Sequence, residues 1–328
     1  MSALRVLIIG GNGVISASCS RLAVERGMTV TLLNRGTDTT RPAIEGAESL
    51  VGDAGDAASI RDAVGTREFD VVANFRAFTP GQVTADVELF AGRTGQYLFI
   101  SSASAYQKPI AHLPITEATP VHNPFWQYSR DKIACEDVLV RAYRESGFPM
   151  TIVRPSHTYD PTLIPLEGGW TALARIRDGR PLVVHGDGTT LWTLTHARDF
   201  ARAFVGLFGN PHALGGSVHI TSDESLTWNA IAGLFGRALG VEPHIVHVTS
   251  DAIARELPEV GAGLLGDKAH SVIFDNTRIK SLVPGWVATT PFAEGVREIT
   301  DWHLADPARQ VVDTDLDAAF DRLAAAAG

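Results

Sequence analysis

The stretch "RVLIIGGNGVISASCSRLAVERGMTVTLLN", residues 5–34, decides the fold of this chain. Residues 5–9 form a short, mainly apolar run, which is typical of a strand buried on both faces. A glycine-rich turn comes next, followed by a helical pattern that ends at Gly27 and a second strand-like run, "TVTLLN". The stretch therefore predicts a strand–helix–strand unit, the building block of a parallel α/β sheet.

The turn between this strand and helix has the spacing G-x-x-G-x-x-S, formed by Gly10, Gly13 and Ser16. Glycine tolerates positive φ and lets a pyrophosphate approach the backbone, while the start of a helix supplies free N–H groups. A glycine-rich turn can also be a plain turn, but the strand–helix–strand context favours a dinucleotide site. The residues expected to bind the cofactor here are Gly10, Asn12, Gly13, Val14 and Ile15.

The end of the second strand normally distinguishes NAD from NADP. An acidic residue there would bind the adenosine ribose of NAD. This chain has Asn34 followed by Arg35, and an arginine can pair with the 2′-phosphate of NADP. The pair favours NADP without excluding NAD, and Arg35 could also be an ordinary surface residue of the turn.

Strand-like runs continue along the first half of the chain as "ESLVGD", "FDVVANF", "QYLFISS" and "MTIVRPS", and they alternate with helical patterns. This alternation predicts a Rossmann-type, doubly wound parallel sheet of the α/β class. We expect residues 1–155 to form a dinucleotide-binding domain, with segments near 182–222 returning to it. Residues 156–328 are expected to form mainly a smaller substrate-binding lobe.

Polar or rigid residues stand at the ends of several of these strands. Asp53 follows the third strand, where it could reach an adenine amino group or simply cap a turn. Asn74 and Pro155 end two later strands. Because the carboxyl ends of the strands line the cofactor crevice in open α/β sheets, we expect these residues to contact the cofactor.

Tyr128 and Lys132 stand four positions apart in "QYSRDK", inside a helical pattern. Residues four apart share one helix face, so the pair could be a polar surface stripe. It could also carry chemistry, because a nearby cation draws the pKa of a phenol down from about 10 and makes it a usable acid–base group. Ser101, Ser102 and Ser104 end the fifth strand, as turn residues or as further site residues.

With "GGNGVIS", "ISSASAY" and "QYSRDK" in this order, the chain resembles the extended short-chain dehydrogenase/reductases, such as UDP-glucose 4-epimerase. It is most similar to the atypical subgroup that includes the chloroplast stem-loop-binding proteins. The resemblance implies that Tyr128 moves the proton, that Lys132 binds the nicotinamide ribose, and that Ser102 holds the reacting oxygen. "VRPSHTYDP" matches another family stretch but has Asp160 where glycine is usual.

Departures from the family pattern narrow the reaction. The sugar dehydratases carry Asp and Glu after the catalytic Thr, whereas this chain has Ala103 and Ser104, which disfavours elimination of water. Trp192 stands where epimerases commonly present an arginine to the diphosphate, and it could stack on a ring or fill the core. Arg175 and Arg177 could bind a phosphate or belong to a solvated helix face. The expected substrate residues are Ser104, His157, Arg175 and Trp192.

Composition limits the remaining classes of function. The 328 residues carry a formal net charge of −9 and no basic run, so no nucleic acid is expected as a partner. Cys19 and Cys135 give no disulfide framework or zinc spacing, which suits a reducing cytoplasm. No metal, signal peptide or membrane span is expected, and a homodimer is left open.

The sequence thus predicts a cytoplasmic NAD(P)-dependent oxidoreductase or epimerase. Hydride would move at a hydroxyl or ketone carbon of a sugar or sugar-like small molecule, with Tyr128 as the acid–base group. The alternative is a non-catalytic dinucleotide-binding protein that senses redox state or binds RNA.

Overall fold

A parallel sheet of seven strands, in the order β11-β6-β5-β4-β1-β2-β3, forms the centre of the first domain in this computed structural model, which describes residues 3–36 and 41–327. The strands are β1 (Arg5–Ile9), β2 (Thr29–Asn34), β3 (Glu48–Val51), β4 (Phe69–Asn74), β5 (Thr94–Ile100), β6 (Met150–Pro155) and β11 (Gly216–Ile220). The predicted Rossmann-type doubly wound sheet is confirmed.

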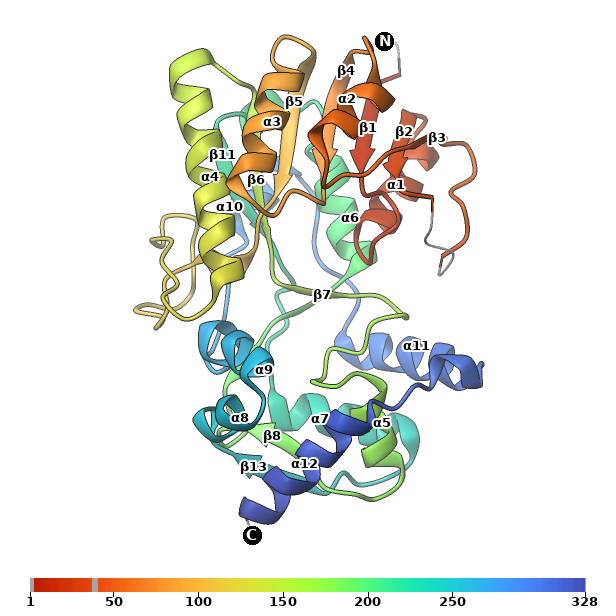
Figure 1. The fold of residues 1–328 in the computed structure, drawn as a ribbon, viewed down its shortest axis with the longest axis vertical. Helices are drawn as coiled ribbons and strands as arrows, with labels where there is room; N and C mark the ends of the chain where they lie inside the picture. The colour runs from red at the N-terminus through yellow and green to blue at the C-terminus, as the bar shows by residue number, and fades with distance from the viewer. Residues whose placement is uncertain (1–2, 37–40, 328) are drawn as a thin grey trace.

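Helices cover both faces of this sheet (Figure 1). Successive side chains of a strand point to opposite faces, so in β1 Val6 and Ile8 pack on one side, and Leu7 and Ile9 pack on the other. The first side is covered by α1 (Ser16–Glu25) and α6 (Ala197–Gly206), with α10 (Thr277–Leu282) beside β11. The second side is covered by α2 (Ala57–Val64), α3 (Pro80–Phe90) and α4 (Gln127–Ser146).

The strand order changes direction at β1, which lies between β2 and β4. The last residue of β1, Ile9, is in register with Leu33 of β2 and Asn74 of β4. The carboxyl ends of these strands therefore open one crevice at a topological switch point, the usual ligand site of such sheets.

The second lobe has its own apolar core, which includes Trp170, Trp192, Trp228, Phe235 and Phe292. Its strands associate in pairs, β10 with β7, β12 with β9, and β13 with β8. Its elements are β7 (His157–Tyr159), α5 (Trp170–Arg177), β8 (Leu182–His185), β9 (Leu191–Trp192), β10 (Leu194–His196), β12 (Leu226–Thr227), α7 (Trp228–Leu239), β13 (Ile245–Val248), α8 (Ser250–Glu256), α9 (Pro258–Gly263), α11 (Phe292–Leu304) and α12 (Thr314–Ala327).

Three short helical turns and one π-helical turn join these elements. They are the 3₁₀ turns η1 (Ala103–Ala105), η2 (Pro211–Ala213) and η4 (Pro307–Arg309), and the π-helical turn η3 (Leu264–Lys268).

The chain returns to the first domain after residue 156, but not over the whole range expected. Helix α6 and strand β11 pack in the first domain, whereas residues 182–185 form β8 and pair with β13 in the second lobe. Helix α10 also returns, because Ile279 belongs to the core beneath α1 and α6. Both lobes are thus assembled from separated segments of chain (Figure 1).

Two further sequence expectations concern single side chains and membrane spans. Cys19 and Cys135 are both free and buried. Across the described residues, none of the helices combines the length and the apolar character needed to traverse a bilayer.

Candidate functional site

The glycine-rich turn has the geometry that its sequence predicts. Gly10 has φ +79°, and a Cβ on it would lie 2.3 Å from the Arg76 side chain. The Ser16 hydroxyl donates to the Gly10 carbonyl at 2.6 Å and accepts from the Gly13 N–H at 2.7 Å. Ser16 therefore braces the turn at the place where a third glycine is common. No side chain caps the start of α1, which leaves its first N–H groups for an anion.

A cavity of about 130 Å³ lies beside this turn and between the ends of β1, β2 and β3. It brings together the predicted residues Asn12, Asn34, Arg35 and Asp53 with the two glycines. Asp53 also accepts from the Gly55 N–H at 2.8 Å, so it braces its own turn as well. The lining residues are Gly10, Asn12, Gly13, Leu33, Asn34, Arg35, Gly36, Gly52, Asp53, Ala54 and Arg76.

Arg76 is a residue of this cavity that the sequence reasoning missed. It follows β4 and is exposed, like Arg35. Among the described residues, neither guanidinium has a carboxylate within ion-pair distance, so two arginines without an ion pair line this cavity, and the Arg76 guanidinium also lies 5.1 Å from the centre of the Phe78 ring. The sequence signal for Arg76 is its position two residues after Asn74, at the end of a strand.

Asn74 lines neither this cavity nor the larger cavity described below. The residue is 2% exposed, and its side-chain amide donates from Nδ2 to Asp86 of α3 at 2.6 Å, while the amide oxygen Oδ1 accepts from the Arg76 and Ala77 N–H groups. Asn74 thus shapes the turn that carries Arg76 instead of pointing at the cofactor. Val14 also lines neither cavity, whereas its neighbour Ile15 lines the larger one.

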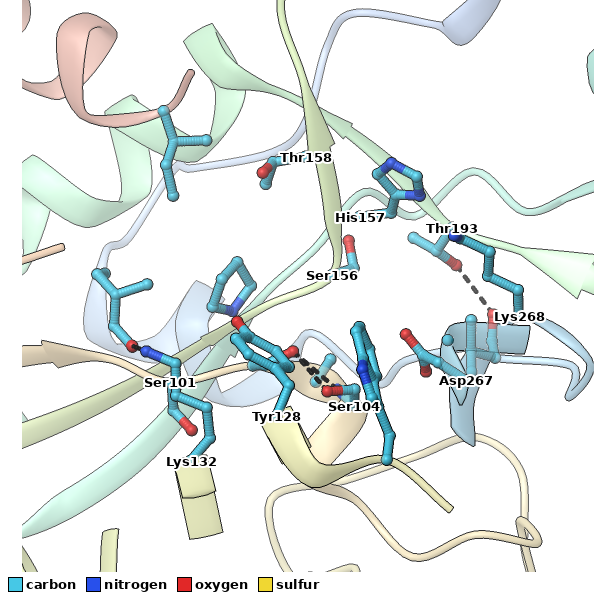
Figure 2. Close-up of a pocket in the computed structure, with 18 of the residues that line it drawn as sticks. Ser101, Ser104, Tyr128, Lys132, Ser156, His157, Thr158, Thr193, Asp267 and Lys268 are labelled. Atoms are coloured by element: carbon cyan, nitrogen blue, oxygen red, sulfur yellow. Dashed lines mark hydrogen bonds between the residues drawn. The ribbon is translucent and has the colours of Figure 1, made fainter. Parts of the chain in front are cut away.

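The larger cavity, of about 400 Å³, lies between the two lobes (Figure 2). It brings together eight of the residues predicted for the cofactor or the substrate. These are Ile15, Ser102, Ser104, Tyr128, Lys132, Pro155, His157 and Trp192. The other lining residues are Phe75, Phe78, Ile100, Ser101, Ala103, Trp126, Ser156, Thr158, Thr193, Gly263, Asp267, Lys268, Val272 and Phe274.

Tyr128 and Ser102 meet at one side of this cavity. The Ser102 hydroxyl contacts the Ser104 hydroxyl at 2.8 Å, and Ser104 in turn contacts the Ser129 hydroxyl at 2.7 Å. Burial raises the pKa of Tyr128 to about 12, and the nearby Ser102 side chain opposes this shift. The pKa of Tyr128 thus lies above its usual value, opposite to the direction expected from Lys132 alone, because desolvation disfavours the phenolate.

Lys132 is held below Tyr128 by backbone carbonyls. Its side chain is 1% exposed, and its ammonium donates to the carbonyls of Ala77 at 2.7 Å and Ile100 at 2.8 Å. The Nζ atom lies 5.8 Å from the centre of the Tyr128 ring. Burial lowers the pKa of Lys132 to about 8. The lysine is thus fixed in place by β5 and the turn after β4.

His157 and Trp192 form a bonded pair on the lobe opposite. Trp192 Nε1 donates to His157 Nδ1 at 3.1 Å, so the neutral imidazole carries its proton on Nε2. Burial, together with the charge of Lys268, lowers the pKa of His157 to about 3. Trp192 is 3% exposed and packs on Trp228 at 5.3 Å between ring centres. It therefore fills the core of the second lobe and lines the cavity at once.

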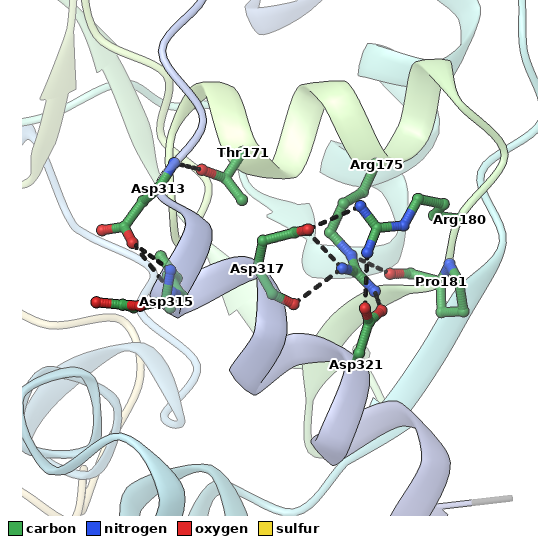
Figure 3. Close-up of polar contacts among 9 residues, drawn as sticks. Thr171, Arg175, Arg180, Pro181, Asp313, Asp315, Asp317 and Asp321 are labelled. Atoms are coloured by element: carbon green, nitrogen blue, oxygen red, sulfur yellow. Dashed lines mark hydrogen bonds and ion pairs between the residues drawn. The ribbon is translucent and has the colours of Figure 1, made fainter.

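Arg175 is not part of the cavity, contrary to the sequence expectation. It is 1% exposed, and its guanidinium bonds Asp317 at 2.6 Å and Asp321 at 2.7 Å, both on α12 (Figure 3). Arg180 bonds the same two aspartates at 2.8 Å and 2.7 Å. The arginine joins α5 to the C-terminal helix, while Arg177 is exposed and pairs with Asp178.

Asp160, the residue that replaces the usual glycine, ties the second lobe to the cofactor side. It pairs with Arg41 at 2.8 Å, and Arg41 also bonds Thr162 and donates to the Asn12 carbonyl at 3.3 Å. Both charged side chains are nearly buried, at 12% and 10% exposure. This Arg41–Asp160 clasp therefore connects the glycine-rich turn with the chain that follows β7.

Asp267 and Lys268 are the charged cavity residues that the sequence reasoning missed. They lie in the π-helical turn η3, which the sequence pattern does not distinguish from a loop. Figure 2 shows them on the side of the cavity across from Tyr128 and Lys132. The arrangement as a whole can hold a carbonyl or hydroxyl against Tyr128 and Ser102, at the open end of a cofactor crevice.

Comparison with known proteins agrees with this geometry. A model of the NAD dependent epimerase/dehydratase family matches residues 6–220. The chain is 28% identical over 256 residues to chloroplast stem-loop binding protein of 41 kDa b from Arabidopsis thaliana, covering 74% of this chain and 65% of that protein, just under two thirds of its length. It is 27% identical over 292 residues to 2'-dehydrokanamycin reductase from Streptomyces kanamyceticus, covering 86% of this chain and 80% of that protein.

A solved structure, that of epimerase Mth375 from Methanothermobacter thermautotrophicus, is similar over 94% of both chains, with a TM-score of 0.78 and 16% identity. A similarity at this level of identity establishes the fold.

Proposed function

The chain belongs to the NAD dependent epimerase/dehydratase family, and from this premise we propose that it transfers hydride between NAD(P) and a hydroxyl or ketone carbon of a sugar or sugar-like substrate. The observation that carries the proposal is that Ser102, Tyr128 and Lys132 line one cavity with Ile15 of the glycine-rich turn. Tyr128 is the acid–base group of the reaction.

The described residues fit a dinucleotide. The glycine-rich turn and the uncapped start of α1 would hold its pyrophosphate. An ammonium has three N–H donors; Lys132 gives two to backbone carbonyls, which leaves one for the nicotinamide ribose. When bound, the nicotinamide would donate or accept the hydride.

Tyr128 would move the proton. In the direction of reduction, its hydroxyl gives a proton to the substrate oxygen, while Ser102 donates a hydrogen bond to the same oxygen. The raised pKa keeps the phenol protonated at neutral pH, which suits a general acid. In the direction of oxidation the phenolate is required, and the positive charge of an oxidised nicotinamide and of Lys132 would favour it.

The finer proposal for the cofactor is a preference for NADP. Arg35 and Arg76 line the adenosine end of the crevice, and Asn34 replaces the acidic residue that would oppose a 2′-phosphate. The substrate is proposed to be less anionic than a nucleoside diphosphate sugar, since Trp192 lines the larger cavity and no arginine is among its described lining residues.

The test is turnover by the purified protein with NADPH and NADH, using a panel of ketosugars and, separately, UDP-glucose. We expect oxidation of the cofactor by at least one ketosugar. Cofactor that copurifies and is not consumed, together with interconversion of sugar epimers, would favour the epimerase within the same proposal. Tight dinucleotide binding without turnover of any panel member would contradict the proposal and support the non-catalytic alternative.

A further inference from the structure

We propose that Asp267 and Lys268 recognise the hydroxyl groups of a glycosyl ring that carries no nucleoside diphosphate. The inference rests on the proposed function, because it assigns the substrate side of the same cavity. It makes these two residues the determinants of substrate specificity, separate from the residues that move the hydride and the proton.

The two residues enter the cavity through a local change of helix geometry. Helix α9 ends at Gly263 and continues as the π-helical turn Leu264–Lys268. Gly263, Asp267 and Lys268 all line the cavity. Single π-helical turns are rare and frequently stand at functional sites, because the extra residue redirects the side chains that follow.

The π-helical turn is fixed relative to the serine residues beside Tyr128. Asn123 donates from Nδ2 to the Gly266 carbonyl at 2.7 Å and to the Ser104 carbonyl at 2.8 Å. Gly266 also packs so closely that a Cβ on it would lie 2.6 Å from Trp126. The Asn123 side chain therefore bonds the backbone on both sides of the cavity. Asp267 and Lys268 thus have a defined position relative to Ser104.

Asp267 is a preorganised hydrogen-bond acceptor. Its Oδ1 lies 3.1 Å from the ammonium of Lys108, whose side chain is fully buried at 0% exposure. The aspartate side chain is 19% exposed and lines the cavity. The charge of Lys108 therefore attracts one carboxylate oxygen through this ion pair, without a hydrogen bond from its ammonium, and the other oxygen is left to accept from a ligand hydroxyl.

Lys268 is a donor beside this acceptor. Its ammonium pairs with Glu167 at 2.8 Å, and the two side chains are 23% and 34% exposed. Its backbone carbonyl accepts from His185 and Trp228 at 3.0 Å and 3.3 Å, which holds its main chain. Since an ammonium has further N–H groups, Lys268 can donate to a ligand oxygen while it keeps this ion pair.

An acceptor and a donor on adjacent residues match neighbouring hydroxyl groups, each of which both donates and accepts. Trp126, Trp192 and Phe274 add aromatic surface to the same cavity, and apolar ring faces pack on such surface. A cavity of about 400 Å³ that must also hold a nicotinamide is small among ligand sites. These features together favour a glycosyl ring over a larger ligand.

Charge disfavours the two obvious rivals. A diphosphate in the cavity would be repelled by the Asp267 carboxylate. Lys268 would compensate this repulsion only in part, because its ammonium is already paired with Glu167. A protonated amine would come close to the ammonium groups of Lys132 and Lys268, which both line the cavity. A neutral polyhydroxylated ring avoids both repulsions.

The experiment measures ligand binding without turnover, using the wild-type protein saturated with NADPH. The probes are methyl glycosides of glucose, galactose, mannose and xylose, the methyl glycoside of glucosamine, and UDP-glucose, each titrated by NMR. We expect a neutral methyl glycoside to bind most tightly. Asp267→Asn and Lys268→Gln should each weaken it about tenfold or more, since each loses a charge-assisted hydrogen bond.

The controls are Asp251→Asn, at an exposed residue, and Lys280→Gln, at a half-buried residue paired with Asp223. Neither residue lines the cavity, so both variants should bind the glycoside like the wild type. Unchanged NADPH affinity shows that each variant is folded, and Lys268→Gln leaves the Asp267–Lys108 pair intact.

Four outcomes would overturn the inference. They are tighter binding of UDP-glucose than of any glycoside, tighter binding of the glucosamine glycoside than of the glucose glycoside, equal binding by wild type and variants, and no glycoside binding at all. Because this experiment needs no catalysis, its failure is distinguishable from failure of the proposed hydride transfer, which turnover measures.

Discussion

The Tyr128 hydroxyl is the single group on which the proposed proton transfer depends. Tyr128→Phe removes only this oxygen, so we expect turnover to fall about 10²- to 10⁴-fold, with dinucleotide affinity largely kept. The matched control is Tyr143→Phe on the same helix, where the ring is 41% exposed and away from the cavity. Steady-state rates and fluorescence titration check both variants. Turnover near the wild-type rate in Tyr128→Phe would remove Tyr128 from the mechanism.

Arg35 is the residue proposed to select NADP. Arg35→Ala is expected to weaken NADPH binding selectively, by roughly tenfold for the loss of a charge-assisted contact with a phosphate. NADH binding should change little, because NADH has no 2′-phosphate. Arg26→Ala, an exposed arginine at the end of α1, serves as the control. A clear preference of the wild type for NADH would refute the choice of NADP.

At the scale of residues, local spacing carried most of the prediction. The four-residue helical spacing of Tyr128 and Lys132 and the strand end at Ser102 are each visible locally, and the family resemblance assigned their roles. Asp267 gave no such signal. Its place in the cavity depends on a π-helical turn and on Lys108, which lies far away in the sequence.

Helix α12 is attached to α5 through Arg175, Arg180 and their two shared aspartates (Figure 3). Arg175→Leu removes the hydrogen bonds of a buried guanidinium but leaves Asp317 and Asp321 paired with Arg180, so we expect a loss of stability of about 2 kcal/mol, as for hydrogen bonds to charged groups. Arg177→Leu is the control on the same helix, because its exposed pair with Asp178 contributes about 1 kcal/mol or less. Urea unfolding and proteolysis near residue 313 measure the difference. If the folded Arg175→Leu variant bound substrate poorly, this result would instead support Arg175 as a substrate-binding residue.

Helix α3 is joined to the sheet by Asp86, whose carboxylate accepts from Asn74 and from Tyr97. Burial raises the pKa of Asp86 to about 6. Because the folded value lies above the unfolded one, this group's contribution to stability is full below about pH 4 and is lost as the pH rises through 6.

Asp86→Asn should therefore gain stability relative to wild type between pH 4.5 and pH 7.5, by on the order of 2 kcal/mol. Urea unfolding at both pH values measures this change. Asp70→Asn provides the control, because Arg5 lowers the pKa of the Asp70 carboxyl, so this group stays ionised over the same pH range and its difference from wild type should not change. Equal differences between wild type and Asp86→Asn at both pH values would contradict the prediction.

At the scale of elements, apolar periodicity predicted the sheet strands and α4 but not the partner of each helix. The pattern of α5 does not reveal that Arg175 faces α12, which lies about 140 residues later in the chain. For the same reason the segment near 182 was expected to return to the first domain, whereas residues 182–185 form β8 of the second lobe. Its pairing with β13 is a contact between distant segments.

The Arg41–Asp160 clasp acts on the whole molecule, because it joins the cofactor side to the second lobe. Asp160→Asn removes the ion pair but keeps an acceptor for the Thr162 N–H, which lies 2.9 Å from Oδ1. We expect dinucleotide release to accelerate roughly fivefold, as the loss of about 1 kcal/mol implies. Stopped-flow displacement of NADPH measures this rate. The control is Asp187→Asn, because Asp187 holds Thr189 in the same way, at 2.9 Å, in an exposed turn. An unchanged release rate in Asp160→Asn would show that the clasp does not retain the cofactor.

The two lobes are interleaved along the chain. After β6 the chain contributes residues 159–194 to the core of the second lobe, 200–220 to the first, 228–274 to the second, 279–286 to the first, and 292–299 to the second. A single recombination event between two related genes therefore cannot exchange one lobe for another. Any hybrid with one splice point would inherit mismatched halves of both cores. New specificity in such a protein must instead arise by substitution within segments such as α9 and the turn that follows it.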